Sequence, residues 1–323
     1  MKVGIIGAGN IAGTMADTLR KMDSVESYGV AAREYGRAAE FAEAYGIQKA
    51  YGSYRELAED PEVELVYIAT PHSHHYEHIK LCLDHGKHVL CEKTFTVNEA
   101  QAREVLALAE ERRLLLTEAI WTRYMPMRKV LDDVVSIGVI GRPYMLTANL
   151  GYIINGKERI RRPELAGGAL LDVGVYPLNF ASMVFGDEVE RITGTAVMMD
   201  TGVDAQNSIT LSYKDGRMAV LNSSAMGLSD RRGVIYGDNG FIEVENINNC
   251  EKIKVYDKKR TLLASYDKPR QISGYEYEVE ACVRAIENGE LECSEMPHEE
   301  TLRIMGWMDE LRRQWGMVYP MEQ

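Results

Sequence analysis

The sequence predicts an α/β protein, with an N-terminal doubly wound parallel sheet of the Rossmann type and a C-terminal α+β domain built on a mostly antiparallel open sheet. Three observations predict this fold. Residues 1–120 alternate short apolar runs with helical stretches, a glycine turn follows the first run, and a series of strands with turn signals begins after Trp121. A chain of 323 residues also exceeds the usual size of one core, so we expect two domains, 1–120 and 121–323.

The first domain is expected to run strand, helix, strand throughout. β-branched and apolar residues predict strands at 2–6, 27–31, 65–69, 88–91 and 114–117. Helical spacing and good helix formers predict helices at 11–22, 33–45, 75–84 and 98–112. This order is typical of a parallel sheet with helices on both faces.

The second domain has a different pattern of predicted elements. A helix at 127–137 precedes strands at 144–153, 189–199, 205–213, 217–224, 233–236, 241–244 and 252–256, with turn signals such as Lys214-Asp215-Gly216 between them. Helices at 275–288 and 298–315 follow. We therefore expect an antiparallel sheet with one face covered by helices.

Composition excludes several classes of protein. The net charge of −12 and the lack of a Lys/Arg-rich run argue against a nucleic-acid partner. Five scattered cysteines without a C-x-x-C pair indicate free thiols and a cytoplasmic protein. The N-terminus lacks the features of a secretion signal, and no apolar run reaches the roughly 18 residues of a membrane span.

The first strand runs into a glycine pattern of the form G-x-G-x-x-A. Gly7 allows a tight turn, Gly9 lets the backbone approach a pyrophosphate, and Ala12 lets the helix pack on the strand. Asn10 and Ile11 open that helix, whose free N–H groups would face the phosphates. A purely structural turn is the alternative, and the strand-helix-strand context favours dinucleotide binding.

The end of the second expected strand indicates which dinucleotide binds. NAD sites usually carry an acid there for the ribose, whereas this chain has Ala31-Ala32-Arg33, with Arg37 one turn later. A guanidinium suits a 2′-phosphate, so NADP is favoured. The alternative is NAD, with Arg33 in solvent and Glu34 serving as the acid.

A histidine-rich segment follows the strand at 65–69, at the edge where open α/β sheets bind ligands. It contains Thr70, Pro71, His72 and His75. One interpretation is that this segment is a polar helix cap whose imidazoles face solvent. A metal site is another, but no Asp or Cys with ligand spacing completes it, so we expect no metal.

Two further segments carry groups suited to proton transfer. Glu92 and Lys93 end the strand at 88–91, and a lysine there can bind the reacting oxygen or lower the pKa of a neighbouring acid. Asp172 and Tyr176 lie four residues apart and so share a helical face. Tyr176 could exchange protons if a cation stabilised its anion, or it could be a core tyrosine bonded to Asp172.

Together these segments resemble the Gfo/Idh/MocA oxidoreductase family over essentially the whole chain. The branch of dimeric dihydrodiol dehydrogenases and NADP-dependent aldose dehydrogenases is nearest. The motifs are Ala31-Ala32-Arg33, Thr70-Pro71-His72-Ser73-His74-His75, Gly86-Lys87-His88-Val89-Leu90-Cys91-Glu92-Lys93, Glu118-Ala119-Ile120-Trp121-Thr122-Arg123 and Asp172-Val173-Gly174-Val175-Tyr176.

The resemblance implies an NAD(P)-dependent enzyme that moves a hydride between nicotinamide and a hydroxyl or carbonyl carbon of a sugar, polyol or diol. It implies that Lys93 contacts substrate and nicotinamide and that Tyr176 is the acid/base, with Asp172 beside it. His72 and His75 match positions near the nicotinamide ribose, while Trp121 and Arg123 match the segment over the cofactor. It also implies a homodimer or homotetramer paired through the open sheet.

One residue departs from the family pattern. Thr94 replaces a proline that commonly follows a cis peptide bond, which is costlier before other residues. Either the loop is strained or it takes another path. An NADP-binding sensor with a degenerate site is therefore the alternative function. Arg159, Arg161 and Arg162 are candidates for contacting an anionic substrate, although a solvated charge run is favoured.

Overall fold

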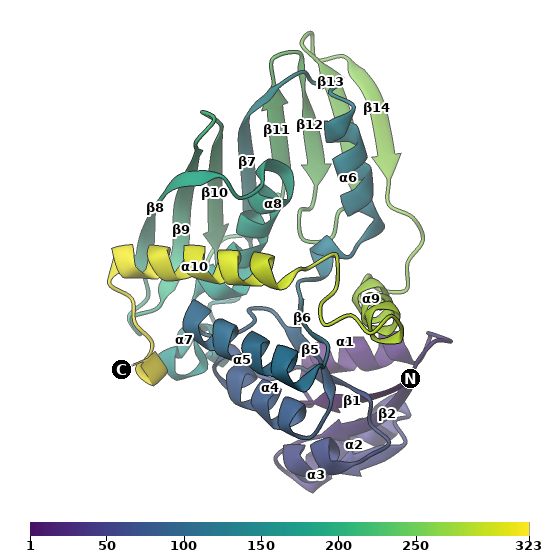
Figure 1. Ribbon diagram of the computed structural model, residues 1–323. Helices are drawn as coiled ribbons and strands as arrows, with labels where there is room; N and C mark the ends of the chain where they lie inside the picture. The colour runs from purple at the N-terminus through teal and green to yellow at the C-terminus, as the bar shows by residue number, and fades with distance from the viewer. Residues whose placement is uncertain (323) are drawn as a thin grey trace. The chain divides into compact units, whose positions relative to one another are not determined.

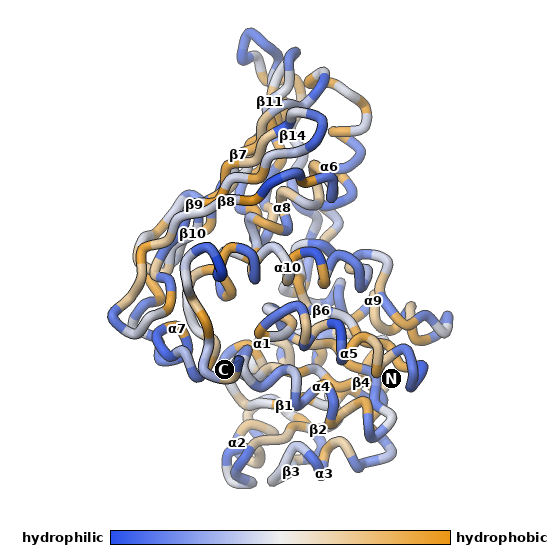
Figure 2. The backbone as a smooth tube through the Cα atoms, turned by 60° about the vertical axis from the view of Figure 1, so that its left-hand side comes forward, coloured by the Kyte–Doolittle hydropathy of each residue, from blue (hydrophilic) through white to orange (hydrophobic). Residues whose placement is uncertain are grey.

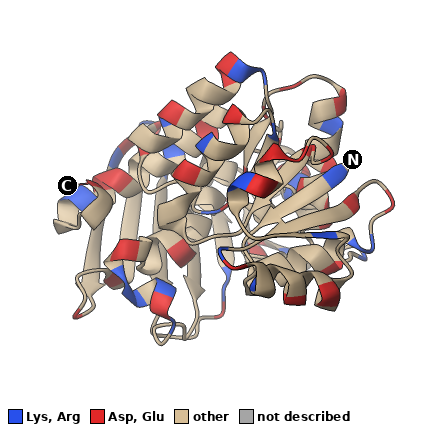
Figure 3. Ribbon diagram, turned by 90° about the horizontal axis from the view of Figure 1, so that it is seen from below, with Lys and Arg blue, Asp and Glu red and all other residues tan. Residues whose placement is uncertain are grey.

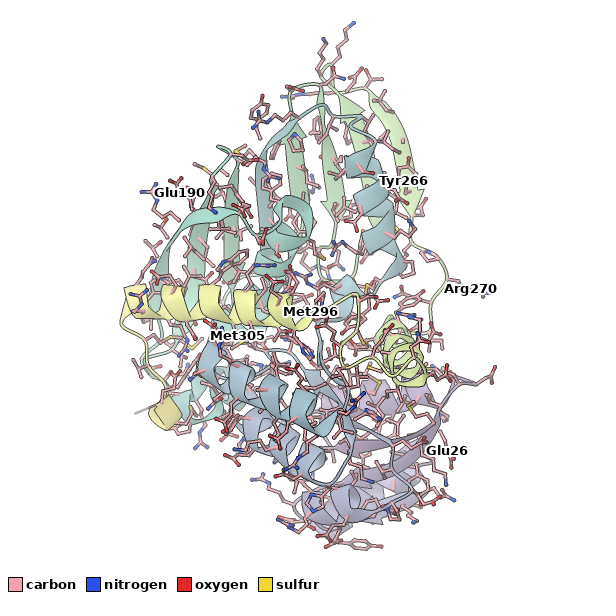
Figure 4. The ribbon with its side chains drawn as sticks, viewed as in Figure 1. Glu26, Glu190, Tyr266, Arg270, Met296 and Met305 are labelled. Carbon is pink, nitrogen blue, oxygen red and sulfur yellow. The ribbon has the colours of Figure 1, made fainter. Side chains whose placement is uncertain are left out.

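A computed structural model describes residues 1–322 of the chain. They form two compact units, each assembled from two stretches of sequence. The first unit contains 1–124 and 271–305, and the second contains 125–270 and the residues from 306 onward. Arg270 and Met305, at which the chain changes from one unit to the other, are labelled in Figure 4.

The first unit is built on a parallel six-stranded sheet (Figure 1). Its strands are β1 (Lys2–Ile6), β2 (Glu26–Ala31), β3 (Lys49–Tyr51), β4 (Leu65–Ile68), β5 (His88–Glu92) and β6 (Leu116–Ala119). They lie in the order β3-β2-β1-β4-β5-β6, so the direction of winding reverses between β1 and β4. Such a reversal leaves a crevice at the carboxyl ends of these two strands. The predicted Rossmann sheet is confirmed.

The helices of this unit cover both faces of the sheet because right-handed crossovers run in opposite directions from β1. Helices α1 (Asn10–Leu19) and α2 (Tyr35–Tyr45) pack on each other. Helix α4 (His75–Asp84) packs between α3 (Tyr54–Glu59) and α5 (Glu99–Arg112). Side chains cap two of them: Ser53 accepts the Glu56 amide, and Asn98 accepts the Gln101 amide.

Residues 271–305 also pack with the first unit, which differs from the expected division at residue 120. Helix α9 (Glu276–Glu287) contacts β5. The Leu116 amide donates to Leu291 O at 3.2 Å, and His298 Nε2 lies 2.8 Å from Leu116 O. His298 begins α10 (His298–Trp315), whose last turns belong to the second unit. Sequence order alone does not reveal this return of the chain.

The second unit contains an eight-stranded sheet. Its strands are β7 (Pro143–Gly151), β8 (Val189–Met198), β9 (Asp204–Tyr213), β10 (Met218–Ser224), β11 (Gly233–Gly237), β12 (Gly240–Glu245), β13 (Lys252–Asp257) and β14 (Leu262–Asp267), in the order β14-β13-β12-β11-β7-β10-β9-β8. Only the pairing of β7 with β10 is parallel within the described residues. The predicted antiparallel character is confirmed.

Burial alternates along these strands, as a one-sided sheet requires. Leu146, Ile209 and Leu221 are buried on the face packed against α8 (Val175–Phe185), whereas Thr147 and Ser208 lie on the opposite face and stay at least partly exposed. Hydrophobic and hydrophilic residues are mixed along the helices α6 (Pro126–Ser136) and α10 (Figure 2). Acidic and basic residues are interspersed over the helices (Figure 3).

One helical stretch, Pro163–Phe185, is long and apolar enough by composition to cross a membrane. Of its apolar window, 89% is buried, which is typical of a core helix. The sequence predicts no such segment, because Glu164 and Asp172 interrupt the apolar run. The elements β3, α3 and β14 were also not expected. The first two are short, and β14 is an exposed edge strand with little alternation in burial.

Candidate active site

The glycine turn after β1 has the geometry that a dinucleotide needs. Gly7 adopts a φ of +107°, and a Cβ placed there would lie 2.9 Å from Ala69 O, so no other residue fits without displacement. Gly9 precedes α1, and a Cβ placed there would have no neighbouring heavy atom within 4 Å among the described residues. The N-terminus of α1, which begins at the exposed Asn10, is therefore accessible to a ligand. Ala12 is fully buried against the sheet.

Two arginines follow β2 beside this turn. Arg33 and Arg37 are exposed, and Arg37 Nη2 donates to Ala8 O at 3.2 Å, inside the glycine turn. Burial lowers the pKa of His74, and the positive charge of Arg33 lowers it further. The guanidinium groups therefore face the loops after β1 and β4, where they could hold a phosphate on the ribose of a dinucleotide.

The histidine-rich segment after β4 is folded onto the sheet. His75 is fully buried, with Nε2 2.8 Å from Thr70 O and Nδ1 2.9 Å from Thr94 O. Burial lowers the pKa of His75, so the neutral ring donates its one N–H to one of these two carbonyls and approaches the other with its unprotonated nitrogen. His75 thereby joins the loops that follow β4 and β5. His72 is also buried and lies edge-on to His75, with ring centroids 5.8 Å apart.

His78 lies deeper in the same segment. Thr70 Oγ1 is 3.0 Å from His78 Nδ1, and burial lowers the pKa of His78 to about 3, so this ring is neutral at physiological pH. Pro71 introduces the short 3₁₀ turn His72–His74. Within residues 1–322, no group of three or more His, Cys, Asp or Glu side chains is arranged to hold a metal ion.

The carboxyl end of β5 carries Glu92, its last residue, and Lys93 follows it. Glu92 is buried and accepts a hydrogen bond from Tyr67 Oη, which comes from the neighbouring strand β4. Lys93 is half-buried, and the peptide bond between Lys93 and Thr94 is cis. Three buried groups bind the following residues: His75 contacts Thr94 O, Glu118 accepts the Phe95 amide, and Cys91 Sγ donates to Phe95 O.

Trp121 and Arg123 follow β6 in a 3₁₀ turn. The Trp121 indole stacks on the ring of Tyr275, with centroids 4.3 Å apart and planes 13° from parallel. Arg123 is buried and donates to Glu300 at 2.7 Å. Both side chains thus tie the end of β6 to residues 271–305.

Asp172 and Tyr176 lie in the second unit, where a π-helical segment (Leu170–Gly174) runs directly into α8. Both side chains are buried. Arg159 donates to Asp172 at 2.5 and 3.4 Å, so the carboxylate is held in a two-point ion pair. Arg161 and Arg162 instead pair with exposed acids, as expected for a solvated charge run.

Asp204, a residue that no sequence pattern predicts to be part of the site, fixes the start of this helical segment. It is fully buried, and its Oδ2 accepts the Leu170 amide at 2.9 Å and Asn207 Nδ2 at 2.8 Å. Burial raises the pKa of Asp204 to about 6 despite these hydrogen bonds. An acid at the first residue of a strand gives no sequence signal for capping a helix 34 residues earlier.

The predicted cofactor residues therefore lie together in the first unit, whereas two of the predicted catalytic residues belong to the second unit. The predicted cofactor residues all lie at or after the carboxyl ends of β1, β2, β4, β5 and β6 in the first unit. They are Gly7, Gly9, Asn10, Ile11, Ala12, Arg33, Arg37, Thr70, Pro71, His72, His75, Glu92, Lys93, Trp121 and Arg123. Asp172 and Tyr176 belong to the second unit.

An open helix N-terminus behind a glycine turn, at the reversal point of a parallel sheet, defines a dinucleotide-binding protein of the Rossmann class. Comparison with known proteins agrees with this class. Residues 1–119 match the oxidoreductase family with an NAD-binding Rossmann fold, and residues 129–243 match the Gfo/Idh/MocA C-terminal domain. The chain belongs to the Gfo/Idh/MocA oxidoreductase family.

Its relatives are dehydrogenases and reductases. The chain is 34% identical to trans-1,2-dihydrobenzene-1,2-diol dehydrogenase of Danio rerio, over 99% of this chain and 98% of the relative. It is 32% identical to D-xylose 1-dehydrogenase (NADP(+)) of Hypocrea jecorina, over 99% and 93%. The crystal structure of KijD10, a 3-ketoreductase from Actinomadura kijaniata in complex with NADP, superposes with a TM-score of 0.89 at 26% identity, covering 97% of both chains.

Proposed function

We propose that this chain is an NADP-dependent oxidoreductase that transfers a hydride between nicotinamide and a hydroxyl or carbonyl carbon of a small sugar, polyol or diol. The observation that carries the proposal is the open N-terminus of α1 at Gly9, with the exposed Arg33 and Arg37 beside it. The named activities of the relatives, on a dihydrodiol and on D-xylose with NADP, support the substrate class.

The residues after β1 and β2 fit NADP. The turn at Gly7 and Gly9 leaves space for a pyrophosphate at the N-terminal amides of α1, and the two arginines match the charge of a 2′-phosphate. When bound, NADP supplies the carbon that accepts or donates the hydride. His75 holds the loops after β4 and β5 in place through its two carbonyl contacts.

Proton transfer is assigned to Tyr176. During oxidation of a hydroxyl, the phenolate of Tyr176 takes the O–H proton while the C–H hydrogen leaves with its electron pair, so that a carbonyl forms. During reduction, the phenol returns the proton to the oxygen. The ammonium of Lys93 stabilises negative charge on that oxygen, and Asp172, fixed by Arg159, orients the substrate hydroxyl groups.

The same proposal includes a cytoplasmic homodimer or homotetramer. All five cysteines are free thiols, which supports a reducing compartment. The uncovered face of the second sheet carries small polar and apolar residues such as Thr147, Ser208 and Val220, a surface suited to pairing with a second copy. Light scattering of the purified protein tests the oligomeric state, and a monomer at micromolar concentration would contradict it.

The experiment that tests the function follows NADPH at 340 nm, as it forms from NADP with aldoses, polyols and diols, or as it is consumed with dicarbonyls. We expect turnover with at least one sugar or diol, and faster turnover with NADP than with NAD. Tight binding of NADPH without any turnover would instead support a sensor with a degenerate site.

A further inference from the structure

Glu118 is a buried acid that the mechanism above does not use. It lies in β6, and its side chain points under the loop that follows β5, because its Oε1 accepts the Phe95 amide at 3.1 Å. Its Oε2 accepts Thr301 Oγ1 of α10 at 3.3 Å. Glu118 is 1% exposed, so both contacts are shielded from water.

The loop after β5 carries Lys93, two residues before Phe95. Its peptide groups are bound by buried side chains: His75 contacts Thr94 O at 2.9 Å, and Glu118 accepts the next amide along the chain. One side chain therefore contacts the carbonyl of Thr94 and another accepts the hydrogen bond of the amide that follows it. Together they hold the peptide plane between Thr94 and Phe95 from two directions.

Burial destabilises the charged form of an acid at this position, so packing alone is a poor reason for an acid here. Burial, with a smaller contribution from the charge of Glu92 in β5, raises the pKa of Glu118 to about 7. The Phe95 amide, Arg123 and Thr301 oppose that increase. Replacing buried ionic groups together with their partners by apolar residues of similar volume is often neutral or stabilising, so packing alone does not account for an acid here.

We propose that Glu118 is a positioning residue for Lys93, which holds the Lys93–Thr94–Phe95 loop through the Phe95 amide. This inference rests on the proposed function for the role of Lys93, whereas the loop contact itself does not. The competing explanation is that Glu118 serves only to attach α10 through Thr301. The two explanations differ in which variant disturbs the loop.

The test compares three variants with the wild-type protein. Glu118→Leu removes the acceptor and keeps most of the volume, with Glu118→Ala as a second variant should the first not fold. Glu118→Gln keeps an acceptor for the Phe95 amide and can also donate to Thr301. Thr301→Val removes only the contact to α10. Rates are expressed per NADPH-binding site, so that unfolded protein does not contribute.

The first readout is hydrogen–deuterium exchange of the peptide spanning residues 93–97. We expect faster exchange in Glu118→Leu and Glu118→Ala, and near wild-type exchange in Glu118→Gln and Thr301→Val. The second is kcat, which we expect to fall about 10- to 100-fold in the Leu and Ala variants through misplacement of Lys93, while the affinity for NADPH stays within about threefold.

A third readout does not depend on turnover. The rate at which an amine-acylating reagent modifies Lys93, followed by mass spectrometry, should change several-fold in Glu118→Leu and remain unchanged in Thr301→Val. If the wild-type protein turns over no substrate, the proposed function fails, and exchange and acylation still decide the role of Glu118. Wild-type exchange and acylation in Glu118→Leu, or equal effects of Thr301→Val, would overturn the proposal.

Discussion

Arg159 donates to both carboxylate oxygens of Asp172, at 2.5 and 3.4 Å, one helical turn before Tyr176. The carboxylate is buried, whereas the Arg159 side chain is 42% exposed. Arg159→Ala should therefore destabilise the protein by about 1–3 kcal/mol, because the exposed arginine is lost cheaply but the Asp172 carboxylate stays buried without this partner. The freed carboxylate should, however, bind substrate hydroxyl groups poorly and lower kcat/KM by roughly tenfold.

Steady-state kinetics of Arg159→Ala, Arg159→Lys and Arg161→Ala check this prediction. Lysine keeps the charge but not the two-point geometry, so Arg159→Lys should be intermediate. Arg161 pairs with the exposed Asp200, and its removal should leave kcat/KM unchanged. Equal losses in Arg159→Ala and Arg161→Ala would argue for a general effect of surface charge.

Gly9→Ala should separate cofactor binding from folding. A Cβ at Gly9 meets no neighbouring atom among the described residues, and its φ of −100° suits alanine, so the melting temperature should stay unchanged. The methyl group would occupy the space that a pyrophosphate needs at the helix N-terminus, so the Kd for NADPH should rise about tenfold or more.

Gly36→Ala is the matched control, since its Cβ also meets open space but lies in α2. Fluorescence titration with NADPH measures both variants. Unchanged affinity in Gly9→Ala would place the dinucleotide elsewhere.

Arg33→Ala should reduce discrimination between the two nicotinamide cofactors. A hydrogen bond to a charged group contributes about 1.5–3 kcal/mol, which corresponds to roughly 10- to 100-fold in the Kd for NADPH. Affinity for NADH, which lacks the 2′-phosphate, should change little. The exposed Arg20, which pairs with Asp17 in α1, provides a control substitution to alanine. An equal loss of NADH and NADPH affinity in Arg33→Ala would contradict the assignment.

Asp204 should make stability depend on pH. Burial raises its folded-state pKa from 3.8 to about 6. The contribution of Asp204 to the free energy of unfolding is therefore fully present below about pH 4. It is lost as pH rises through about 6, a decrease on the order of 2–3 kcal/mol. Asp204→Asn should flatten this decline between pH 4 and 6.5 while still accepting the Leu170 amide. Urea unfolding across this range measures it. The exposed Asp200→Asn is the control, and an unaltered slope in Asp204→Asn would refute the assignment.

The first half of the fold could be predicted because its signals are local. The glycine turn, the apolar run of each strand and the residues after it lie together in sequence, and parallel strands bring their carboxyl ends to one edge. The long strands of the second unit were likewise visible from alternation. By contrast, β3 has three residues and β14 is an exposed edge, so neither buries enough apolar surface to leave a pattern.

The contacts of the candidate site were harder to predict because they join distant residues. Glu118 reaches Thr301 across 183 residues, and the Asp204 side chain caps a segment 34 residues before it. An acid at the end of an apolar strand was a weak hint in the case of Glu118. His75 was predicted near the cofactor, but its position between the carbonyls of Thr70 and Thr94 appears only in the folded chain.

The most direct test of the account is the turnover of Tyr176→Phe, measured at 340 nm on whichever sugar or diol the wild-type protein oxidises with NADP. Loss of the proton-transferring hydroxyl should lower kcat by on the order of 100-fold or more and leave the affinity for NADPH nearly intact. Tyr266→Phe, at a partly exposed tyrosine of β14, should behave as wild type. Wild-type turnover in Tyr176→Phe would contradict the proposed mechanism.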